Sequence, residues 1–541
     1  FLRPLGLRLP HQMKDMDRLV EILAQKIRKQ VHIRIIGDYD VDGVTSSHLF
    51  LTALRRVGAK VDVVIPHRIQ DGYGLSLHLL QQAKEDGVDT ILTCDNGIAA
   101  IDEIAWAKAQ KMTVLVTDHH AVPFEEHEGR RTEKKSLADA VVNPHQQDCG
   151  YPYKELCGAG VAWNVIRVLY ENYDMDKREA EDLLDFVAMA TVCDVMSLTG
   201  ENRILVKEGL KRIRHTKNIG LQALMQACNV QPENISAYHF GYVLGPCVNA
   251  TGRLDTARHA LRLFETGQET EAEEIARDLV DLNQERKELT LQGVEMAKKL
   301  CEEGGYEKDP VLVLFLPDVH ESIAGLIAGR IREMYNRPVF VLTRGEEGVK
   351  GSGRSTENYS MYENMCGCAE LFTKFGGHPM AAGLSLPEEN VEKFRRKINE
   401  NCPLTVEEVC PDIHIDMAMP VGYASTELVH QFALLEPFGK DNPSPLFADR
   451  NLSISRMWLI GKNRNVLRMS VLSEYGQPVP VIFFGDVETL FAYFTEKFGQ
   501  EEVENALHGR KNRILFSMVY TAKIDFYQGN ENLQLEMKYY R

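Results

Sequence analysis

Apolar runs and amphipathic stretches alternate along the first quarter of the chain. Aliphatic and β-branched residues gather in short runs at 31–36, 61–65, 89–93, 112–116 and 140–142. Longer stretches with helical periodicity separate the first four runs, at 46–57, 77–84 and 99–110. Strand–helix alternation at this spacing predicts parallel βαβ units, in which functional residues collect at the carboxyl ends of the strands. We therefore expect an α/β domain with a parallel sheet.

The pattern changes twice further along the chain. Residues 271–303 are uninterrupted by proline and carry apolar residues at helical spacing, which predicts one long connecting helix. A second, smaller α/β unit follows, with strands at 311–316 and 339–342 and a helix at 323–335. After Pro403 the apolar runs are short and separated by turns, which predicts a small OB-like barrel with strands at 412–417, 452–460, 466–472, 479–484, 514–521 and 533–539.

Length and composition agree with several globular domains. The 541 residues exceed what one core supports, and we expect boundaries at 1–215, 216–305, 306–405 and 406–541. No apolar run approaches the ~20 residues of a membrane helix and no signal-peptide pattern is visible, so we expect a cytoplasmic protein without a membrane partner. The sequence starts at Phe1 rather than Met, which indicates a trimmed start.

Charge and cysteine content narrow the chemistry. The net charge of −16 excludes a uniformly basic nucleic-acid coat, although a local stripe of Lys and Arg remains compatible with phosphate binding. The 11 cysteines include no CxxC pair, which is typical of reduced thiols. His145, Cys149 and Cys157 offer an alternative zinc set, but their spacing matches no common zinc motif.

An acidic motif follows the first predicted strand. Asp38, Asp40 and Asp42 occupy every second position between Gly37 and Gly43, and an extended chain would project them to one side. Two like charges ~4 Å apart repel by roughly 4 kcal/mol at a protein-like dielectric, so such a cluster requires a cation or raised pKa values. A solvated acidic turn explains the motif equally well when it is considered alone.

Three further segments bring metal-type ligands to the same edge. Asp95 follows the strand at 89–93, Asp118-His119-His120 follows the strand at 112–116, and Asp194 ends a predicted helical stretch at 182–192. Carboxylates with one or two imidazoles suit Mn²⁺ or Mg²⁺, and so many carboxylates suggest two ions, which could clamp the attacking and leaving oxygens of a phosphoryl displacement. The four segments together predict a metal site.

These motifs resemble those of the DHH phosphoesterase superfamily, and the chain is most similar to its branch of single-strand-specific DNA exonucleases. The resemblance covers nearly the whole chain. It implies that the metal ligands are Asp40, Asp42, Asp95, His119 and Asp194. It also implies that Asp38 and Asp118 support the ligands and that His120 contacts the scissile phosphate or assists protonation, with a purely ligand-orienting role as the alternative.

Candidate phosphate contacts lie in the following two predicted domains. Arg253, beside Gly252, can form a bidentate phosphate fork or can simply close a helix end. His320 precedes a predicted helix N-terminus, and Gly351–Ser355 is small enough for close backbone approach. We expect Phe375–His378 to end a helix, where a glycine pair is often only a cap. The resemblance to the DHH-associated domain implies phosphate contacts from His320, Ser352, Arg354, Ser355, Gly376, Gly377 and His378.

The predicted barrel carries a basic and aromatic set. Arg456, Lys462, Arg464 and Arg468 accompany Trp458, a combination that suits single-strand binding and is equally compatible with a solvated barrel face.

The resemblance implies a 5′-to-3′ exonuclease of DNA repair and recombination that releases mononucleotides. It also implies a monomer that works with a single-strand-binding protein and a helicase. Alternatives are a nanoRNA or cyclic-dinucleotide phosphodiesterase and a non-catalytic replication scaffold.

Overall fold

The chain divides into two compact units in a computed structural model. The structure describes residues 6–68, 71–72, 74–127, 130–345, 348–404, 413–461, 464–527 and 530–541. The larger unit comprises Leu5–Met196 and Gly200–Pro411, and the smaller consists mainly of Asp412–Arg541. The chain thus combines a mixed α/β unit with a separate C-terminal unit, as the sequence pattern predicts.

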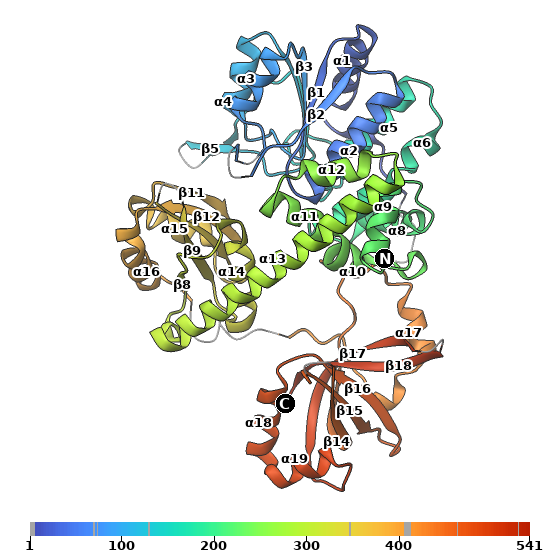
Figure 1. Ribbon diagram of the computed structural model, residues 1–541, viewed down its shortest axis with the longest axis vertical. Helices are drawn as coiled ribbons and strands as arrows, with labels where there is room; N and C mark the ends of the chain where they lie inside the picture. The colour runs from blue at the N-terminus through green and yellow to red at the C-terminus, as the bar shows by residue number, and fades with distance from the viewer. Residues whose placement is uncertain are drawn as a thin grey trace. The chain divides into compact units, whose positions relative to one another are not determined.

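A five-stranded parallel sheet forms the first domain of the larger unit. Its strand order is β2-β1-β3-β4-β7, with bounds Val61–Val64, Ile33–Ile36, Thr90–Cys94, Thr113–Thr117 and Ala140–Val142. Helices α3 (Leu77–Glu85) and α4 (Ile101–Ala109) cover one face, and α1 (Met16–Arg28), α2 (Val41–Arg56) and α5 (Gly158–Asn172) lie on the other (Figure 1). Strands β1 and β3 are buried along their whole length, as expected for parallel strands covered on both faces, and the predicted parallel sheet is confirmed. A short hairpin, β5 (Phe124–His127) with β6 (Arg130–Glu133), was not predicted.

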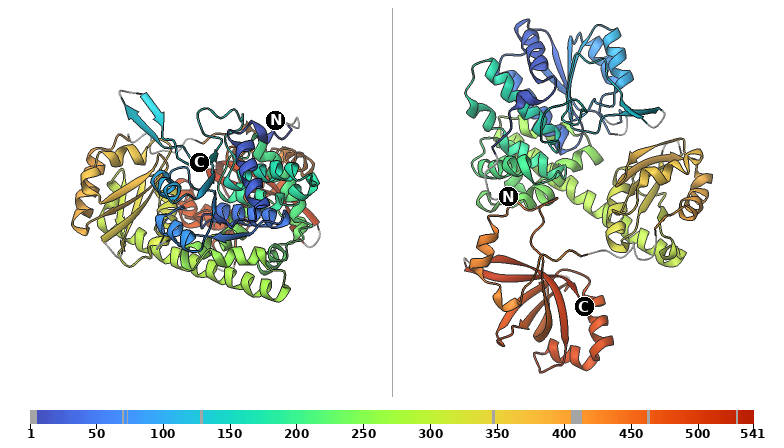
Figure 2. Two further views of the ribbon diagram at one scale, coloured as in Figure 1. Left: turned by 90° about the horizontal axis from the view of Figure 1, so that it is seen from above. Right: turned by 180° about the vertical axis from the view of Figure 1, so that it is seen from behind.

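A helical region connects the sheet to the next domain. It contains α6 (Lys177–Glu181), α7 (Leu184–Cys193), α8 (Gly200–Ile213), α9 (Ile219–Ala227), α10 (Ala237–His239), the π-helix η3 (Phe240–Leu244), α11 (Gly245–Leu254) and α12 (Arg258–Glu265). The long helix α13 (Glu269–Gly304) packs on α9, α11 and α12 and, further along, on α14 (Ala324–Tyr335) (Figures 1 and 2). The prediction of one long connecting helix over 271–303 is confirmed.

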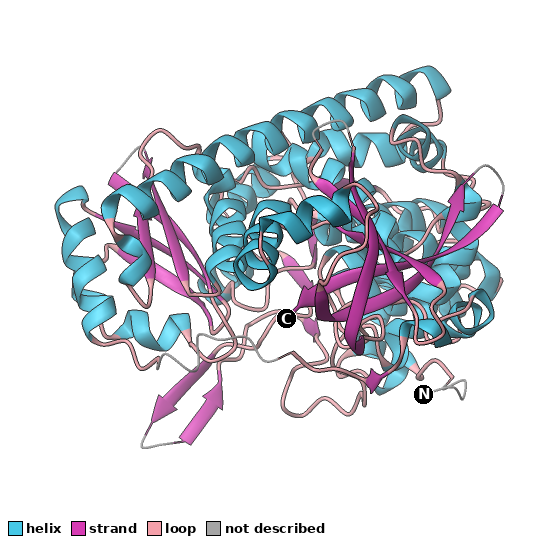
Figure 3. Cartoon of the chain, turned by 90° about the horizontal axis from the view of Figure 1, so that it is seen from below, coloured by secondary structure: helices cyan, strands magenta, loops and turns pink. Residues whose placement is uncertain are grey.

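The second α/β domain contains a mostly antiparallel sheet of order β11-β12-β10-β9-β8. The bounds are Lys374–His378, Ala381–Leu386, Gly348–Arg354, Val339–Gly345 and Leu312–Phe315, and only β8 and β9 pair in parallel. Helices α13 and α14 lie on one side of this sheet, and α15 (Met361–Cys366) and α16 (Val391–Glu400) lie on the other (Figure 3). Apolar side chains pack on both faces of the sheet.

The prediction that Phe375–His378 ends a helix is wrong. These residues form most of β11, where Gly376 pairs with Gly383 and Gly377 with Ala382 of β12. Two adjacent glycines are poor helix formers, whereas pairing with β12 satisfies their backbone groups. A Cβ on Gly377 would lie 2.5 Å from the Ala381 carbonyl oxygen, so the close strand pairing requires a residue without a side chain.

The C-terminal unit is a closed β-barrel. Its sheet order is β13-β14-β15-β16-β18-β17, and β17 also pairs with β14, which closes the barrel. The bounds are Met417–Ala418, Phe447–Ile460, Val466–Leu472, Pro478–Phe483, Asn530–Tyr540 and Leu515–Tyr527. The strand predicted at 412–417 is wrong over 413–416, and residue 412 lies outside the described residues. Helices α17 (Thr426–Phe432), α18 (Val487–Phe498) and α19 (Gln500–Leu507) were not predicted.

Among the described residues, no helix combines the length and the apolar character needed to cross a membrane.

Candidate metal centre and phosphate pocket

The parallel sheet brings the acidic motifs together because β1, β3 and β4 are neighbours. The loop Gly37–Asp40 leaves β1, Asp95 follows β3, and Asp118-His119-His120 follow β4, all at the carboxyl edge. Asp194 arrives from a different direction, as the C-cap of α7, which packs on α2. All four predicted segments therefore contribute to one site.

The first motif is only partly extended. Asp40 is the N-cap of α2, with its side chain accepting a hydrogen bond from Gly43 N at 3.0 Å, and Asp42 lies in the first helical turn. The expectation of an extended chain through Asp42 is therefore wrong, because the capping bond starts the helix at Val41. Asp42 is instead held by the N-terminus of α5, whose Gly158 and Ala159 N–H groups donate to its carboxylate at 2.6 and 2.8 Å.

His119 Nε2 lies at the centre of the cluster. It is 3.1 Å from Asp95 Oδ1 and 3.6 Å from both Asp42 Oδ2 and Asp194 Oδ2. Three sets of potential ligand atoms lie within 4.8 Å of one another: Asp95, His119 and His120; Asp42, His119 and Asp194; and Asp38, Asp40 and Asp95. Asp95 is common to two sets and His119 to two, so the arrangement has the form of two adjoining cation sites.

The residues present fit divalent ions that favour oxygen ligands. The buried Asp38 Oδ1 has no hydrogen-bond partner among the described residues, although burial without a partner is costly for a carboxylate oxygen. The cluster offers carboxylate oxygens and imidazole nitrogen, the donor set of Mn²⁺ and Mg²⁺. The nearby thiols of Cys94 and Cys157 belong to none of these groups of potential ligand atoms among the described residues, and burial raises the pKa of both thiols, that of Cys94 to about 12.

Asp95 and Asp38 of the cluster resist ionisation without a cation. Burial raises the pKa of Asp95 well above its usual range, and the charges of Asp42 and Asp40 add to the effect. Burial and the charge of Asp40 likewise raise the pKa of Asp38. A divalent cation would reverse this balance, because it stabilises the ionised carboxylates that the protein alone disfavours.

Asp118 and His120 form a pair beside the cluster. The Asp118 carboxylate accepts hydrogen bonds from the N–H groups of Ile98, His119 and His120 at 2.8, 2.7 and 3.1 Å, and its Oδ1 lies 2.8 Å from His120 Nδ1. Burial alone would lower the pKa of His120, but the hydrogen bond and charge of Asp118 raise it to about 9. The His120 side chain is 44% exposed and that of Asp118 only 1%, so His120 is the member of the pair that faces solvent.

Backbone geometry explains how the ligands approach one another. Asp95 adopts a left-handed conformation with φ of 62°, which Asp tolerates better than most residues. A Cβ on Gly158 would lie 2.6 Å from Asp95 Cβ and 2.8 Å from its Oδ1. Gly158 therefore permits α5 to approach both Asp42 and Asp95, a role that the sequence alone did not reveal.

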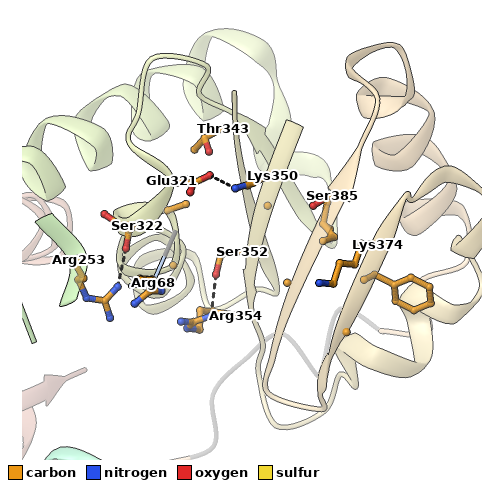
Figure 4. A pocket seen from close by; sticks show the side chains of 17 residues that line it. Arg68, Arg253, Glu321, Ser322, Thr343, Lys350, Ser352, Arg354, Lys374 and Ser385 are labelled. Atoms are coloured by element: carbon orange, nitrogen blue, oxygen red, sulfur yellow. Dashed lines mark hydrogen bonds and ion pairs between the residues drawn. The ribbon is translucent and has the colours of Figure 1, made fainter. Parts of the chain in front are cut away.

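A second site, the phosphate pocket, lies between the first domain and the antiparallel sheet within the larger unit (Figure 4). Its volume is about 460 Å³. Among the predicted residues, those that line it are Arg253, Ser352, Arg354 and Gly376. Arg68, Lys350 and Lys374 also line it and were not predicted. Arg68 follows the second predicted strand by three residues, so the rule that functional residues collect after parallel strands could have identified it.

The two predicted arginines are held by backbone oxygens. Arg253 Nη1 donates to Ser322 O at 2.7 Å, and Arg354 Nη1 donates to Gly353 O at 2.7 Å and to Ser352 Oγ at 3.2 Å (Figure 4). Burial lowers the pKa of Arg253 to about 9, and the charge of Arg68 contributes. Burial and Arg68 also lower the pKa of Arg354. An anion in the pocket would relieve this unfavourable concentration of positive charge.

The other predicted phosphate contacts lie outside the lining of this pocket. His320 caps the short helix η5 (Glu321–Ile323), with Nδ1 2.7 Å from Ser322 Oγ. Ser355 is buried and donates to Tyr359 O at 2.5 Å. His378 Nδ1 accepts from Met380 N at 3.3 Å, and Gly377 pairs with Ala382. His320 thus contacts Ser322, whose carbonyl oxygen accepts the hydrogen bond from Arg253.

The basic and aromatic set of the barrel is brought together in part. Trp458 on β14 pairs with Arg468 on β15, and the guanidinium carbons of Arg456 and Arg468 lie 5.7 and 5.9 Å from its ring centroid. Arg464 lies in the turn between the two strands. Lys462 lies outside the described residues.

The alternative zinc residues His145, Cys149 and Cys157 do not assemble among the described groups that could hold a metal, and Cys157 instead caps α5.

Family models match three parts of the chain. The DHH family N-terminal domain matches residues 32–191, the DHHA1 domain matches 308–402, and the RecJ OB domain matches 415–539. These segments correspond to the parallel sheet with its metal centre, the antiparallel sheet and the barrel.

Curated relatives match over most of the chain. It is 33% identical to the single-stranded-DNA-specific exonuclease RecJ of Haemophilus influenzae, covering 98% of this chain and 91% of that protein. It is 33% identical to RecJ of Bacillus subtilis, where the match covers 86% of this chain and spans only 58% of the relative.

Solved structures agree with these matches. RecJ of Thermus thermophilus in complex with Mn²⁺ superposes with a TM-score of 0.79 at 26% identity, covering 100% of this chain and 73% of that one. An exonuclease RecJ bound to manganese superposes with a TM-score of 0.62 at 31% identity, covering 73% of this chain and 96% of that one. With these matched domains and 33% identity over most of both chains, the chain belongs to the RecJ family of the DHH phosphoesterases.

Proposed function

We propose that the chain is a metal-dependent exonuclease that hydrolyses single-stranded DNA. The observation that carries the proposal is the convergence of three carboxylates, from three separate segments, on His119 Nε2. Family membership supports the substrate, because the curated relatives are single-stranded-DNA-specific exonucleases. The resemblance implies digestion from 5′ to 3′ with release of mononucleotides.

The proposed metal ligands are Asp40, Asp42, Asp95, His119 and Asp194. Relatives of known structure hold Mn²⁺ or Mg²⁺, which supports the same ions here. When bound, such ions polarise the phosphoryl group and acidify water, which is the chemistry that phosphodiester hydrolysis requires. Gly158 and Ala159 orient Asp42, and Asp38 lies at the edge of the cluster as a support.

His120 is proposed to contact the scissile phosphate. Its pKa of about 9 keeps the imidazole protonated near neutral pH, so it can donate a hydrogen bond to a phosphate oxygen or a proton to the leaving group. Asp118, with its carboxylate saturated by backbone N–H groups, fixes the ring through Nδ1 and leaves Nε2 to act.

The phosphate pocket is proposed to hold a further phosphate of the strand. Arg68, Arg253 and Arg354 present guanidinium groups that match phosphate oxygens, and Ser352 adds a hydroxyl. The Arg456, Trp458 and Arg468 cluster of the barrel is proposed to stack and neutralise more distant nucleotides, together with Arg464 and Lys462. Gly376 lines the phosphate pocket and is proposed as a further phosphate contact. The remaining predicted contacts, His320, Ser355, Gly377 and His378, are proposed as supports of that pocket.

The barrel is also what favours a long substrate over a dinucleotide. A closed barrel of the OB type is a common platform for single strands, and a dinucleotide phosphodiesterase has no need for one. We place the domain boundaries at residues 215, 305 and 405. We also propose that the protein is a cytoplasmic monomer. Because its substrate would be single-stranded cellular DNA, a single-strand-binding protein and a helicase would supply the strands.

Single strands labelled separately at the 5′ and 3′ ends test this proposal. In Mn²⁺ the chain should release the 5′ label first, as a mononucleotide, while a duplex of the same sequence is digested at least tenfold more slowly. EDTA should abolish the reaction. Release of the 3′ label first would contradict the direction, and equal digestion of dinucleotides and long strands would favour the small-substrate alternative.

A further inference from the structure

Two cysteines from different helices meet outside both sites described above. Cys228 is the C-cap of α9, and Cys247 lies in the first turn of α11. Their Sγ atoms are 3.8 Å apart, within hydrogen-bond distance for sulfur. Both helices pack on α13 (Figure 1). Neither cysteine belongs to the groups of potential metal ligands among the described residues. We call these two residues the thiol pair.

The long helix α13 places polar groups against the thiol pair. The buried Asn283 donates from Nδ2 to Cys247 Sγ at 3.3 Å, and its Oδ1 accepts two hydrogen bonds from Arg286, at 3.1 and 2.8 Å. Lys287, one turn after Asn283, acts on the pair through its charge. A polar and cationic environment favours the thiolate, which is the reactive form of cysteine. Two thiols that served only to fill the core would not need this amide or these cations.

The two thiols of the pair are not equivalent. Cys228 is partly exposed, whereas Cys247 is only 1% exposed. The hydrogen bond with Cys247 lowers the pKa of Cys228 despite burial, and the charge of Lys287 acts in the same direction. The same hydrogen bond, together with burial, raises the pKa of Cys247. Burial raises the pKa of four thiols elsewhere in the chain, those of Cys94, Cys157, Cys193 and Cys368. Cys228 is therefore the thiol that is best suited to react first.

The two sulfurs are within reach of a covalent bond. The S–S length of a disulfide is about 2.05 Å, so sulfurs that are 3.8 Å apart must approach by about 1.8 Å. Cys228 ends its helix and is followed by the exposed Asn229, so this side of the pair can adjust without breaking a helix interior. In a reducing compartment, disulfides are usually transient and catalytic or redox-sensing.

Helix α11 connects the thiol pair to both functional sites. Two residues after Cys247, Asn249 Oδ1 accepts a hydrogen bond from Val41 N at 3.1 Å, and Val41 lies between two of the proposed metal ligands. Arg253, one helical turn further along α11, lines the phosphate pocket. A displacement of the first turn of α11 therefore reaches the metal centre and the phosphate pocket together.

We propose that the thiol pair is a site of reversible oxidation, at which hydrogen peroxide converts Cys228 and Cys247 into a disulfide. The Cys228 thiolate attacks one oxygen of the peroxide, the O–O bond breaks, and the hydroxide that leaves takes up a proton to give water. Cys247 sulfur then displaces hydroxide from the resulting sulfenic acid. The S–S bond forms as the S–O bond breaks, and the hydroxide and the Cys247 proton give a second water. The peroxide accepts the two electrons that the thiols lose, and a dithiol reductant restores both thiols.

Closing the disulfide should lower the activity of the chain. The new bond pulls the start of α11 toward α9 and so displaces Asn249 and Arg253 from their partners. We expect kcat/KM for single strands to fall about tenfold, because displacements of the order of 1 Å are costly for catalysis. This effect rests on the proposed exonuclease function, whereas the oxidation itself does not.

Peptide mass mapping of the full chain tests the oxidation. The metal-free chain is treated with hydrogen peroxide, its remaining thiols are alkylated, and it is digested with chymotrypsin, which cuts between the two cysteines at Tyr238. We expect a peptide containing Cys228 joined to one containing Cys247, and no such product after treatment with dithiothreitol. Recovery of both peptides unlinked, as alkylated thiols or as sulfinic acids, would overturn the proposal.

Two variants separate the thiol pair from other thiols. Cys228→Ser should keep the activity of the untreated chain and should no longer lose activity after peroxide. Cys366→Ser removes an exposed thiol outside the pair and is the matched control, which should lose activity about tenfold, as we expect for the parent chain, and recover it in dithiothreitol. Peroxide is removed before Mn²⁺ and the strand are added.

The outcomes distinguish the two proposals. An equal loss of activity in Cys228→Ser and the parent chain would refute the effect through α11, and disappearance of the linked peptides in Cys366→Ser would refute the pairing of Cys228 with Cys247. If the untreated chain is inactive on single strands, the proposed function fails, and the linked peptides alone decide whether the thiol pair is oxidised.

Discussion

The metal centre and the phosphate pocket differ in charge but share one electrostatic problem. In the metal centre, burial and neighbouring carboxylates raise the pKa of Asp95. In the phosphate pocket, burial and neighbouring guanidinium groups lower the pKa of Arg253. The protein neutralises each cluster only in part, as Glu321 does for Lys350 in the phosphate pocket, so each favours a ligand of opposite charge. A strand that bridges metal ions and the arginines would satisfy both at once.

The two sites also differ in how the backbone holds them. The proposed ligands of the metal centre come mostly from the ends of parallel strands, and Asp42 is fixed by the backbone N–H groups of Gly158 and Ala159. The arginines of the pocket are long side chains held by backbone carbonyl oxygens, as Arg253 is by Ser322. Small displacements should therefore damage the metal centre more than the pocket, since a long side chain can readjust.

The largest effect is expected for Asp95→Asn. This change keeps the shape of the side chain and its tolerance of φ near 62°, but it removes the charge that two of the potential ligand sets share. Turnover in Mn²⁺ should fall by roughly 10³-fold, since a metal site supplies several kcal/mol of transition-state stabilisation. Mn²⁺ affinity, measured by calorimetry, should fall with it.

The same variant tests the electrostatic comparison. Because the substitution replaces one of several repelling carboxylates with a neutral amide, the melting temperature in EDTA should stay the same or rise. Turnover close to that of the wild type would refute the assignment of Asp95, and a large loss of stability in EDTA would refute the account of repulsion.

Gly158→Ala should have the next largest effect. The added Cβ would lie 2.6 Å from Asp95 Cβ, so α5 or the strand end must shift, and a displacement of this kind should reduce turnover by about 10²-fold.

Gly160→Ala, in the same first turn of α5, is the matched control. Its Cβ would meet Leu156 at 3.4 Å, an ordinary contact, and activity should remain within about twofold while helix stability improves by roughly 0.5–1 kcal/mol. Equal losses in the two variants would mean that α5 tolerates no side chain there for reasons unrelated to Asp95.

Gly325→Ala should have the smallest of the three effects. Its Cβ would lie 2.8 Å from both Arg354 Nη2 and Ser352 Oγ, but the arginine can move away. We expect the KM for single strands to rise by about tenfold with a smaller change in kcat, as for Arg354→Ala, because the interaction is with substrate phosphate away from the reacting bond. Gly329→Ala, one turn later on α14 with no atom within 4 Å, should leave both constants unchanged. A fall in kcat with unchanged KM in Gly325→Ala would place Arg354 in the chemical step instead.

Residues after strands were predictable, whereas residues that meet by packing were not. Asp95 and Asp118 follow short, largely apolar strands, and neighbouring parallel strands end at one edge, so their convergence could be inferred. Gly158 is 116 residues from Asp42, and nothing in its local sequence indicates that α5 donates to that carboxylate. Ser355 appeared in a motif suited to phosphate, but its hydroxyl donates to Tyr359 O because the turn after β10 brings the two together.

The sequence by itself determined the order of the domains, the parallel sheet and the acidic character of its edge, because hydrophobic periodicity and strand-end position are local properties. It also indicated the barrel and the long helix α13. Only the tertiary structure decided that His119 lies at the centre of three carboxylates, that Arg68 joins Arg253 and Arg354, and that the sulfurs of Cys228 and Cys247 lie 3.8 Å apart. Each of these depends on side chains from separate elements meeting at distances of a few ångströms, which are set by helix packing and not by any pattern along the chain.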